Sequence, residues 1–140
     1  CAPLWGTVES MLNTTKDIHV IRDATRGGVG TVLYEIAAQS KVGIHLDSQA
    51  IPVDPAVRGV CGMLGLEPLY LACEGRLVIF APRDVADDLV AVLRKGKYSQ
   101  NAAIIGEVTA DQPGRVVMRT EIGAETLLPP PGGELLPRIC

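Results

Sequence analysis

The chain has 140 residues, of which 47% are hydrophobic and 21% charged, so one domain with a single core is expected. Its net charge is −3 and its 13 Lys and Arg residues form no block, which argues against a nucleic-acid-binding surface. No apolar run reaches the roughly 18 residues that cross a membrane, and the first residues lack the basic and apolar regions of a signal peptide. We therefore expect a cytoplasmic protein without a membrane or nucleic-acid partner.

The four cysteines stand at positions 1, 61, 73 and 140. They form no Cys-x-x-Cys pair and have no histidines at ligand spacing, so no metal site is expected. Free thiols are the ordinary state of cysteine in the cytosol. Cys61 falls among the apolar positions of a predicted helix, where a buried core residue is expected.

A glycine loop is the most suggestive interior stretch. Apolar spacing predicts a helix over residues 5–11, a short buried strand over 18–21, and a helix from about Val29 to Ser40. Between the strand and the second helix lies the loop, residues 22–30. A strand, a glycine loop and a helix amino terminus are typical of an anion site, because backbone N–H groups and the helix dipole face the ligand.

Within this loop, Asp23 or Thr25 could cap the helix, and Arg26 could bind a phosphate or carboxylate. Gly27 and Gly28 would let an oxyanion approach the backbone closely. The alternative is that the two glycines only make a tight turn.

Residues 41–47 alternate as a half-exposed strand does, with His45 on the solvated side. Asp54 and Pro55 are typical of a helix start and Gly65 of a helix end. The helix between them is expected to pack inward through its apolar positions, which are Val57, Val60, Cys61 and Leu64.

Glu74 lies between apolar segments, just before a continuous apolar strand over residues 77–80. Partial burial there would suit a general acid or base. The alternative is an exposed turn glutamate, paired with Arg76.

A further helix over residues 82–95 and a hairpin of strands 102–108 and 115–119 complete the predicted domain, with a type II turn at 112–115. A last short strand leads into the tail. Because strands and helices do not strictly alternate, we expect an α+β sandwich with a mixed sheet.

Three prolines and two glycines follow Leu128 and precede the final Pro137-Arg138-Ile139-Cys140. Proline removes backbone donors and glycine adds freedom, so a flexible tail is expected, about 40 Å long if fully extended. Arg138 would favour the thiolate of Cys140, which makes Cys140 the candidate reactive thiol. The alternative is an incidental cysteine at a frayed end.

Three motifs in order resemble the carboxyl-terminal half of the HypE family of hydrogenase maturation proteins. They are residues 22–28, residues 74–78 and the terminal residues 137–140, and the resemblance covers essentially the whole chain. It implies a PurM-like carboxyl-terminal domain of the aminoimidazole ribonucleotide synthetase superfamily over residues 1–127 and a flexible carrier tail over 128–140. The family's amino-terminal domain, which would bind most of ATP and Mg²⁺ and form a homodimer, is not in this chain.

The resemblance implies an ATP-dependent carbamoyl dehydratase. Cys140 would receive a carbamoyl group from the HypF carbamoyltransferase, and ATP would phosphorylate the amide oxygen. Glu74 would then remove the nitrogen proton to give a thiocyanate, whose cyanide passes to iron on the HypC–HypD complex. The implied nucleotide contacts in this half are Asp23, Thr25, Arg26, Gly27 and Gly28, and the isolated domain is expected to be inactive.

Two positions depart from the family pattern, because Ala24 stands where proline is common and Cys73 where asparagine is usual. Two rival functions stay open. One is another synthetase of the superfamily, making selenophosphate or purines, which needs no terminal cysteine. The other is a non-catalytic interaction module whose tail docks on a partner.

Overall fold

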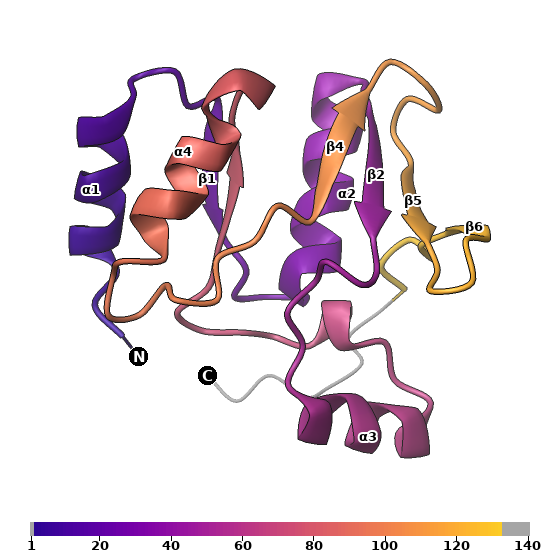
Figure 1. Cartoon of the computed structure of the whole chain (residues 1–140). Coiled ribbons are helices and arrows are strands. Elements are labelled where there is room, and N and C mark those ends of the chain that lie inside the picture. Colours follow the sequence, from indigo (N-terminus) through magenta and orange to yellow (C-terminus); the bar gives the residue numbers. More distant parts are fainter. Residues whose placement is uncertain (1, 133–140) are drawn as a thin grey trace.

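The computed structural model describes residues 2–132 (Figure 1). Its elements in chain order are α1 (Trp5–Thr14), β1 (Val20–Asp23), α2 (Gly28–Ser40), β2 (Gly43–Asp47), α3 (Pro55–Leu64), the 3-10 helix η1 (Pro68–Tyr70), β3 (Leu77–Phe80), α4 (Arg83–Leu93), β4 (Gly106–Thr109), β5 (Val116–Arg119) and β6 (Glu125–Leu127). The predicted α+β class with a mixed sheet is confirmed. Within the described residues, no helix is both long and apolar enough to span a bilayer.

The strands form two sheets. β1 pairs with β3 in an antiparallel ribbon, and the other sheet has the order β4-β2-β5-β6. The predicted hairpin of β4 and β5 is wrong, because β2 lies between them, antiparallel to β4 and parallel to β5. The predicted turn does form: the Arg115 N–H donates to the Gln112 carbonyl at 3.1 Å, and Gly114 has the positive φ of 76° that a type II turn requires.

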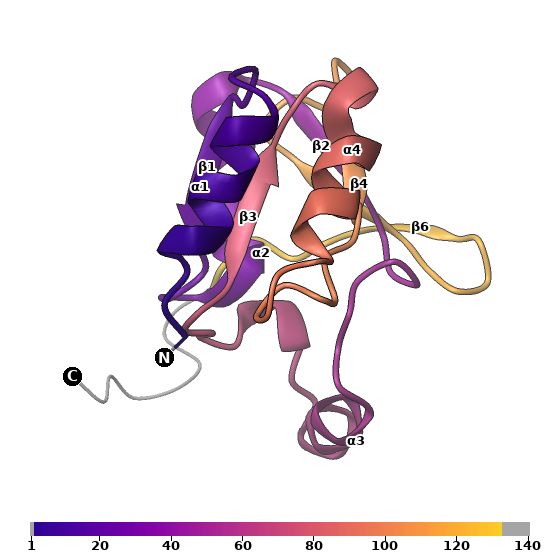
Figure 2. The same cartoon turned by 60° about the vertical axis from the view of Figure 1, so that its left-hand side comes forward.

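The β1–β3 ribbon is apolar on both faces, and each face meets a different layer. Ile21 and Ile79 pack with the α1 and α4 side chains, whose buried residues are Met11, Leu89 and Leu93. The alternate positions Val20, Val78 and Phe80 pack toward α2. Two views show α1 and α4 together on the outer side of the ribbon (Figures 1 and 2). The strand period of two therefore accounts for a ribbon that packs against a different layer on each side.

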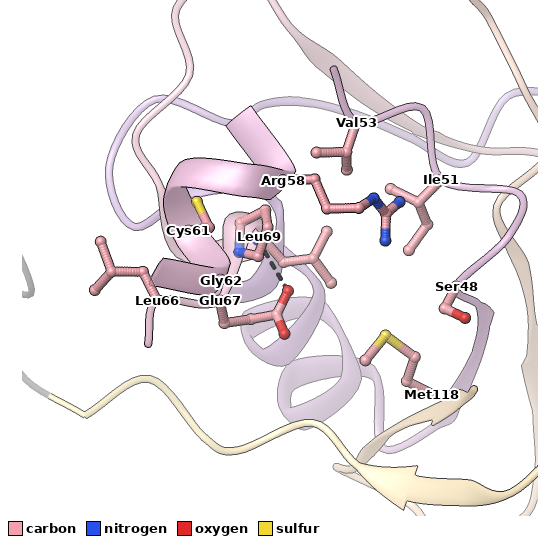
Figure 3. Close-up of a pocket in the computed structure, with 11 residues that line it drawn as sticks. Ser48, Ile51, Val53, Arg58, Cys61, Gly62, Leu66, Glu67, Leu69 and Met118 are labelled. Carbon is pink, nitrogen blue, oxygen red and sulfur yellow. Dashed lines mark hydrogen bonds between the residues drawn. The ribbon is translucent and has the colours of Figure 1, made fainter. Parts of the chain in front are cut away.

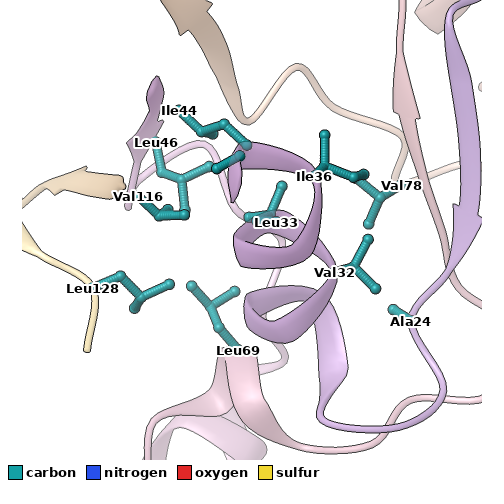
Figure 4. Packing of buried hydrophobic residues seen from close by; sticks show 11 residues of the cluster. Ala24, Val32, Leu33, Ile36, Ile44, Leu46, Leu69, Val78, Val116 and Leu128 are labelled. Atoms are coloured by element: carbon teal, nitrogen blue, oxygen red, sulfur yellow. The ribbon is translucent and has the colours of Figure 1, made fainter. Parts of the chain in front are cut away.

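Helix α2 is the centre of the main core (Figure 4). Leu33 points toward the larger sheet, where Ile44, Leu46 and Val116 are buried, and Val32 and Ile36 point toward Val78 of the ribbon. Each of these side chains stabilises the fold by about 1.5–3 kcal/mol through burial.

Helix α3 begins and ends as the sequence predicts, but its packing differs. The Asp54 carboxylate accepts a hydrogen bond from the Ala56 N–H at 2.8 Å, and Gly65 ends the helix with a φ of 66°. Cys61 is buried, whereas the other predicted inward residues are exposed, namely Val57, Val60 and Leu64. In two views α3 projects from the body at the η1 end (Figures 1 and 2). Helical periodicity correctly predicted the apolar face of α3, but no residue between 2 and 132 packs over most of it.

His45 also differs from its prediction. Its side chain is half-buried rather than solvated, and its Nε2 atom is buried without a hydrogen-bond partner in the described structure. The strand predicted over 18–21 is found two residues later, as β1.

Candidate active site beside the tail root

The glycine loop and the turn that carries Glu74 are joined through the backbone of Ala24. The Ala24 N–H donates to the Arg76 carbonyl at 3.1 Å, and the Ala24 carbonyl accepts from the Cys73 N–H at 3.1 Å. These bonds extend the β1–β3 pairing, in which Asp23 lies opposite Leu77. Ala24 itself is fully buried. The two segments predicted to carry chemistry therefore lie together at one end of the ribbon.

The departure at Ala24 has a structural consequence. Proline has no N–H and could not donate to the Arg76 carbonyl. With alanine the loop and the turn gain a hydrogen bond, worth about 1 kcal/mol net.

The amino terminus of α2 is without a side-chain cap. Gly27 occupies the cap position with a φ of 66°, and no side chain accepts from the first turn. The predicted capping by Asp23 or Thr25 is wrong, because the Thr25 hydroxyl instead donates to Asp23 Oδ2 at 3.4 Å. The first-turn N–H groups keep their capacity to bind an anion.

The two loop arginines have different surroundings. Arg22 is paired with Glu35 of α2, with 3.0 Å between Nη2 and Oε2. Arg26 is exposed and forms no ion pair with any residue between 2 and 132. Arg26 is therefore the loop cation available to an external anion.

Gly28 and Gly30 are needed for close packing. A Cβ on Gly28 would lie 2.4 Å from the Leu69 carbonyl oxygen and 2.5 Å from that of Leu71. A Cβ on Gly30 would lie 2.5 Å from the Tyr70 ring. The glycines thus bring α2 directly onto η1, a role that the sequence reasoning did not include.

Glu74 is exposed, in a turn completed by Gly75 with a φ of 73°. Of the two readings that the sequence left open, the exposed turn glutamate is the one found, and the partial burial that would suit a general acid or base is not. Across residues 2–132 no ion pair joins Glu74 to Arg76 either. The carboxylate is accessible to a group that approaches from solvent.

The start of the predicted tail is held by the domain. Leu128, assigned by sequence to the tail, is 1% exposed, and its N–H donates to the Val116 carbonyl at 2.9 Å. The Tyr34 hydroxyl donates to the Leu128 carbonyl, and the Tyr70 hydroxyl donates to the Pro129 carbonyl. We call Leu128 and Pro129 the tail root. Cys140 lies outside the described residues.

The two tyrosines connect the tail root to the candidate site, since Tyr34 belongs to α2 and Tyr70 to η1. Burial raises the pKa of Tyr70 to about 12, with smaller contributions from Tyr34 and Glu67. Burial also raises the pKa of Tyr34. Both hydroxyls therefore stay protonated as donors at neutral pH. No residue pattern predicts this pair, because its acceptors are backbone atoms far along the chain.

Two pockets of the described residues lie away from the glycine loop and the Glu74 turn. One of 220 Å³ opens between α3, η1 and β5, and its lining includes Arg58, Cys61, Leu69 and Met118 (Figure 3). Another, of 460 Å³, lies between α1 and the end of α4. No group of three or more metal-ligating residues occurs between residues 2 and 132. Neither of these two pockets is lined by a residue of the glycine loop or by Glu74.

Central helix, ribbon and mixed sheet together define a domain of the aminoimidazole ribonucleotide synthetase class. The chain belongs to the family of the AIR synthase related protein, C-terminal domain, which matches residues 5–119. It is 44% identical over 137 residues to the carbamoyl dehydratase HypE of Azotobacter vinelandii and 45% identical over 139 residues to that of Cupriavidus necator. These alignments cover 98% and 99% of the chain but only 40% of each relative.

Solved structures agree. A crystal structure of the hydrogenase maturation protein HypE matches with a TM-score of 0.92 and 46% identity, over 99% of this chain and 45% of that one. A HypE–HypF complex matches with a TM-score of 0.88 and 37% identity, over 93% of this chain and 42% of that one. HypE in complex with ATP matches with a TM-score of 0.85 and 43% identity, over 93% and 41%.

Proposed function

We propose that this chain is the thiol-carrying half of an ATP-dependent carbamoyl dehydratase of [NiFe]-hydrogenase maturation. The observation that carries the proposal is the likeness to enzymes of that name, at 44–45% identity over nearly the whole chain. The geometry supports it, because the tail root, the glycine loop and the Glu74 turn belong to one packed unit.

In the proposed reaction Cys140 holds a carbamoyl group as a thiocarbamate. Transfer of a phosphoryl group from ATP to the amide oxygen converts that oxygen into a leaving group. Glu74 takes the nitrogen protons, directly or through water, and loss of phosphate gives the thiocyanate on Cys140. The carrier thiol has to reach Glu74, and an exposed Glu74 leaves that approach open.

The residues present fit a phosphate of ATP. Donors come from the uncapped amino terminus of α2 at Gly27 and Gly28. Arg26 supplies a cation that forms no ion pair within residues 2–132. Asp23 and Thr25 are the other loop residues proposed to contact the nucleotide, and the Thr25 hydroxyl donates to Asp23. Mg²⁺ would neutralise phosphate charge, and in this proposal most of its ligands and of the nucleotide site belong to a part of the protein outside this chain.

We further propose that the partners are those implied by the resemblance. A HypF-type carbamoyltransferase would load Cys140, and a HypC–HypD complex would receive cyanide at iron. The whole protein would be a cytoplasmic homodimer. The solved HypE–HypF complex of a relative supports the first of these contacts.

The test is reconstitution of the full-length parent protein with carbamoyl phosphate, ATP and the transferase. Intact-mass and peptide analysis should show a carbamoyl group on the Cys140 peptide, and then loss of water from it when ATP is hydrolysed. The Cys140→Ala protein is the control and should show neither change.

An unmodified Cys140 peptide under these conditions would reject the carrier role and favour a synthetase of the same superfamily. If Cys140→Ala still matures hydrogenase in cells, the interaction-module alternative gains instead.

A further inference from the structure

The pocket between α3, η1 and β5 lies apart from the candidate active site and has both apolar and charged walls. Most of its lining is apolar and includes Ile51, Val53, Leu69 and Met118. Its polar members are Ser48 and two groups of opposite charge, Arg58 of α3 and Glu67 at the start of η1. Apolar walls with a few polar groups that fix orientation are typical of small-molecule sites.

Arg58 keeps the capacity to bind a further carboxylate. Its ion-pair partner is Glu121, with 3.9 Å between Nη1 and Oε1, and both side chains are exposed. An exposed pair of this kind contributes little to stability. A ligand carboxylate can therefore replace or join Glu121 at the guanidinium, which can donate two parallel hydrogen bonds.

Glu67 keeps the capacity to bind an ammonium group. Its carboxylate accepts one hydrogen bond, from the Leu69 N–H at 3.3 Å, and it forms no ion pair within residues 2–132. A carboxylate can accept several hydrogen bonds. In Figure 3 the Arg58 side chain extends from α3 toward Ile51, whereas the Glu67 carboxylate lies beside Leu69. The pocket thus offers separate positions for an anionic and a cationic group.

Ser48 adds a hydroxyl without a partner. Its N–H donates to the Arg119 carbonyl at 3.1 Å, but its Oγ atom is buried and has no hydrogen-bond partner in the described part of the chain. Such a hydroxyl is unfavourable in a folded protein. Because Ser48 also lines the pocket, rotation of its side chain to another staggered position lets the hydroxyl donate to a ligand there.

The volume of the pocket, 220 Å³, limits the size of the ligand. A cavity of about 150 Å³ takes benzene, so at the same density this pocket takes about nine non-hydrogen atoms. Leucine and methionine, as free amino acids, have this size. Each also carries one carboxylate, one ammonium group and an apolar side chain.

We propose that this pocket binds a free α-amino acid with an apolar side chain of the size of leucine or methionine. Arg58 and Ser48 bind its carboxylate, Glu67 binds its ammonium group, and its side chain packs against Leu69 and Met118. No residue of the candidate active site lines the pocket, so the inference is independent of the proposed dehydratase reaction.

The test is isothermal titration calorimetry of the full-length parent protein with L-leucine. We expect saturable binding with a dissociation constant of about 1 mM or below. The analogue 4-methylpentanoate lacks the ammonium group and 3-methylbutylamine lacks the carboxylate. Each should bind at least about tenfold more weakly than L-leucine, because one charged group of the pocket is left without its partner.

Two variants remove one charge each. Arg58→Gln and Glu67→Gln should both weaken L-leucine binding at least about tenfold. Arg58→Gln should not change the affinity for 3-methylbutylamine, and Glu67→Gln should not change that for 4-methylpentanoate. Arg83→Gln is the matched control, because Arg83 also forms an exposed pair at 3.9 Å, with Glu107, and does not line the pocket.

The remaining variant tests the hydroxyl. Ser48→Ala should weaken L-leucine binding about threefold or more without lowering the midpoint of thermal unfolding, because no partner of its Oγ atom is lost among the described residues. Thermal unfolding also shows that the other variants are folded.

Three results would overturn the inference. Absence of binding by L-leucine would show that the pocket does not take an amino acid in the parent protein. Equal affinities for L-leucine and its two analogues would show that the two charges are not used. Unchanged L-leucine binding in both Arg58→Gln and Glu67→Gln would place the ligand elsewhere.

Discussion

The hydroxyl of Tyr70 donates a hydrogen bond to the backbone carbonyl of Pro129, 59 residues further along the chain. With the neighbouring bond from Tyr34 to the Leu128 carbonyl, it holds the tail root to α2 and η1. Gly28 and Gly30 allow those two helices to touch. The geometry of the candidate site and the starting point of the tail are therefore set by the same contacts.

Removing one of these hydroxyls should loosen the tail root. In Tyr70→Phe the Pro129 carbonyl loses its donor, so the free energy of unfolding should fall by about 0.5–1.5 kcal/mol. The Leu128 amide should exchange with solvent faster, as measured by hydrogen exchange. Tyr98→Phe is the control, because Tyr98 is exposed and makes no bond to the tail root. An unchanged exchange rate at the Leu128 amide would show that the Tyr70 hydroxyl does not hold the tail root.

Alkaline pH should weaken the fold through Tyr70. Its pKa is raised from 10.0 to about 12 by burial, so the folded state holds this proton more tightly than the unfolded chain does. The stabilisation is complete below about pH 10 and is lost as pH rises toward about 12. Urea midpoints measured across this range should fall less in Tyr70→Phe than in the natural chain. Parallel curves would show that Tyr70 does not carry the effect.

Burial of Leu128 should make the tail root part of the cooperative fold. Leu128→Ala should lower the free energy of unfolding by about 2–5 kcal/mol, because it leaves a cavity in the core cluster that also contains Leu33 and Leu69. Leu127→Ala is the matched control, since Leu127 is 50% exposed. Denaturant unfolding of both proteins measures the difference. Similar small losses would place Leu128 outside the core.

Alanine substitutions should change the free energy of unfolding in opposite directions at a closely packed glycine and at an open one. Gly28→Ala places a methyl group against two backbone carbonyls at a positive φ, so we expect a loss of about 2 kcal/mol or more. Gly59→Ala, in α3, meets nothing within 4 Å and should stabilise the helix by up to about 1 kcal/mol. Opposite signs in the unfolding midpoints are the expected result.

Glu74 should act after loading of the carrier thiol. In the full-length parent, Glu74→Gln should leave carbamoylation of Cys140 unchanged and slow thiocyanate formation by about 10²–10⁴-fold. Single-turnover mass analysis separates the two steps. Glu125→Gln, on the exposed strand β6, serves as the control. Equal dehydration rates in both variants would remove Glu74 from the reaction.

The bounds of a helix or strand were predictable where the sequence has specific start and stop residues or a continuous apolar run. Asp54, Pro55 and Gly65 fixed both ends of α3, and a continuous apolar run fixed β3. Strand pairing was not predictable in the same way. The type II turn before Arg115 is compatible with a hairpin, but β2 pairs with both neighbouring strands and separates them.

The candidate site, like the fold, was predictable in some parts and not in others. Its loop and its glutamate could be found from residue types, because glycine, arginine and carboxylate have specific uses at such positions. The bridge through Ala24 and the acceptors at the tail root are backbone atoms, which every residue has, so no residue type reveals them. The exposure of Glu74 and of the outer face of α3 depends on what the rest of the fold covers.

The place of β2 in its sheet also affects how the chain is made. Leu46 pairs with Gly106, and Ile44 pairs with Val116, so both partners are translated 60 and 72 residues later (106 − 46 and 116 − 44). At about 5–20 residues per second, the ribosome leaves this strand waiting for roughly 3–15 s with its apolar side chains unpaired. During biosynthesis β2 therefore exposes apolar side chains that a chaperone can bind. The core closes when β4 and β5 leave the ribosome and pair with β2.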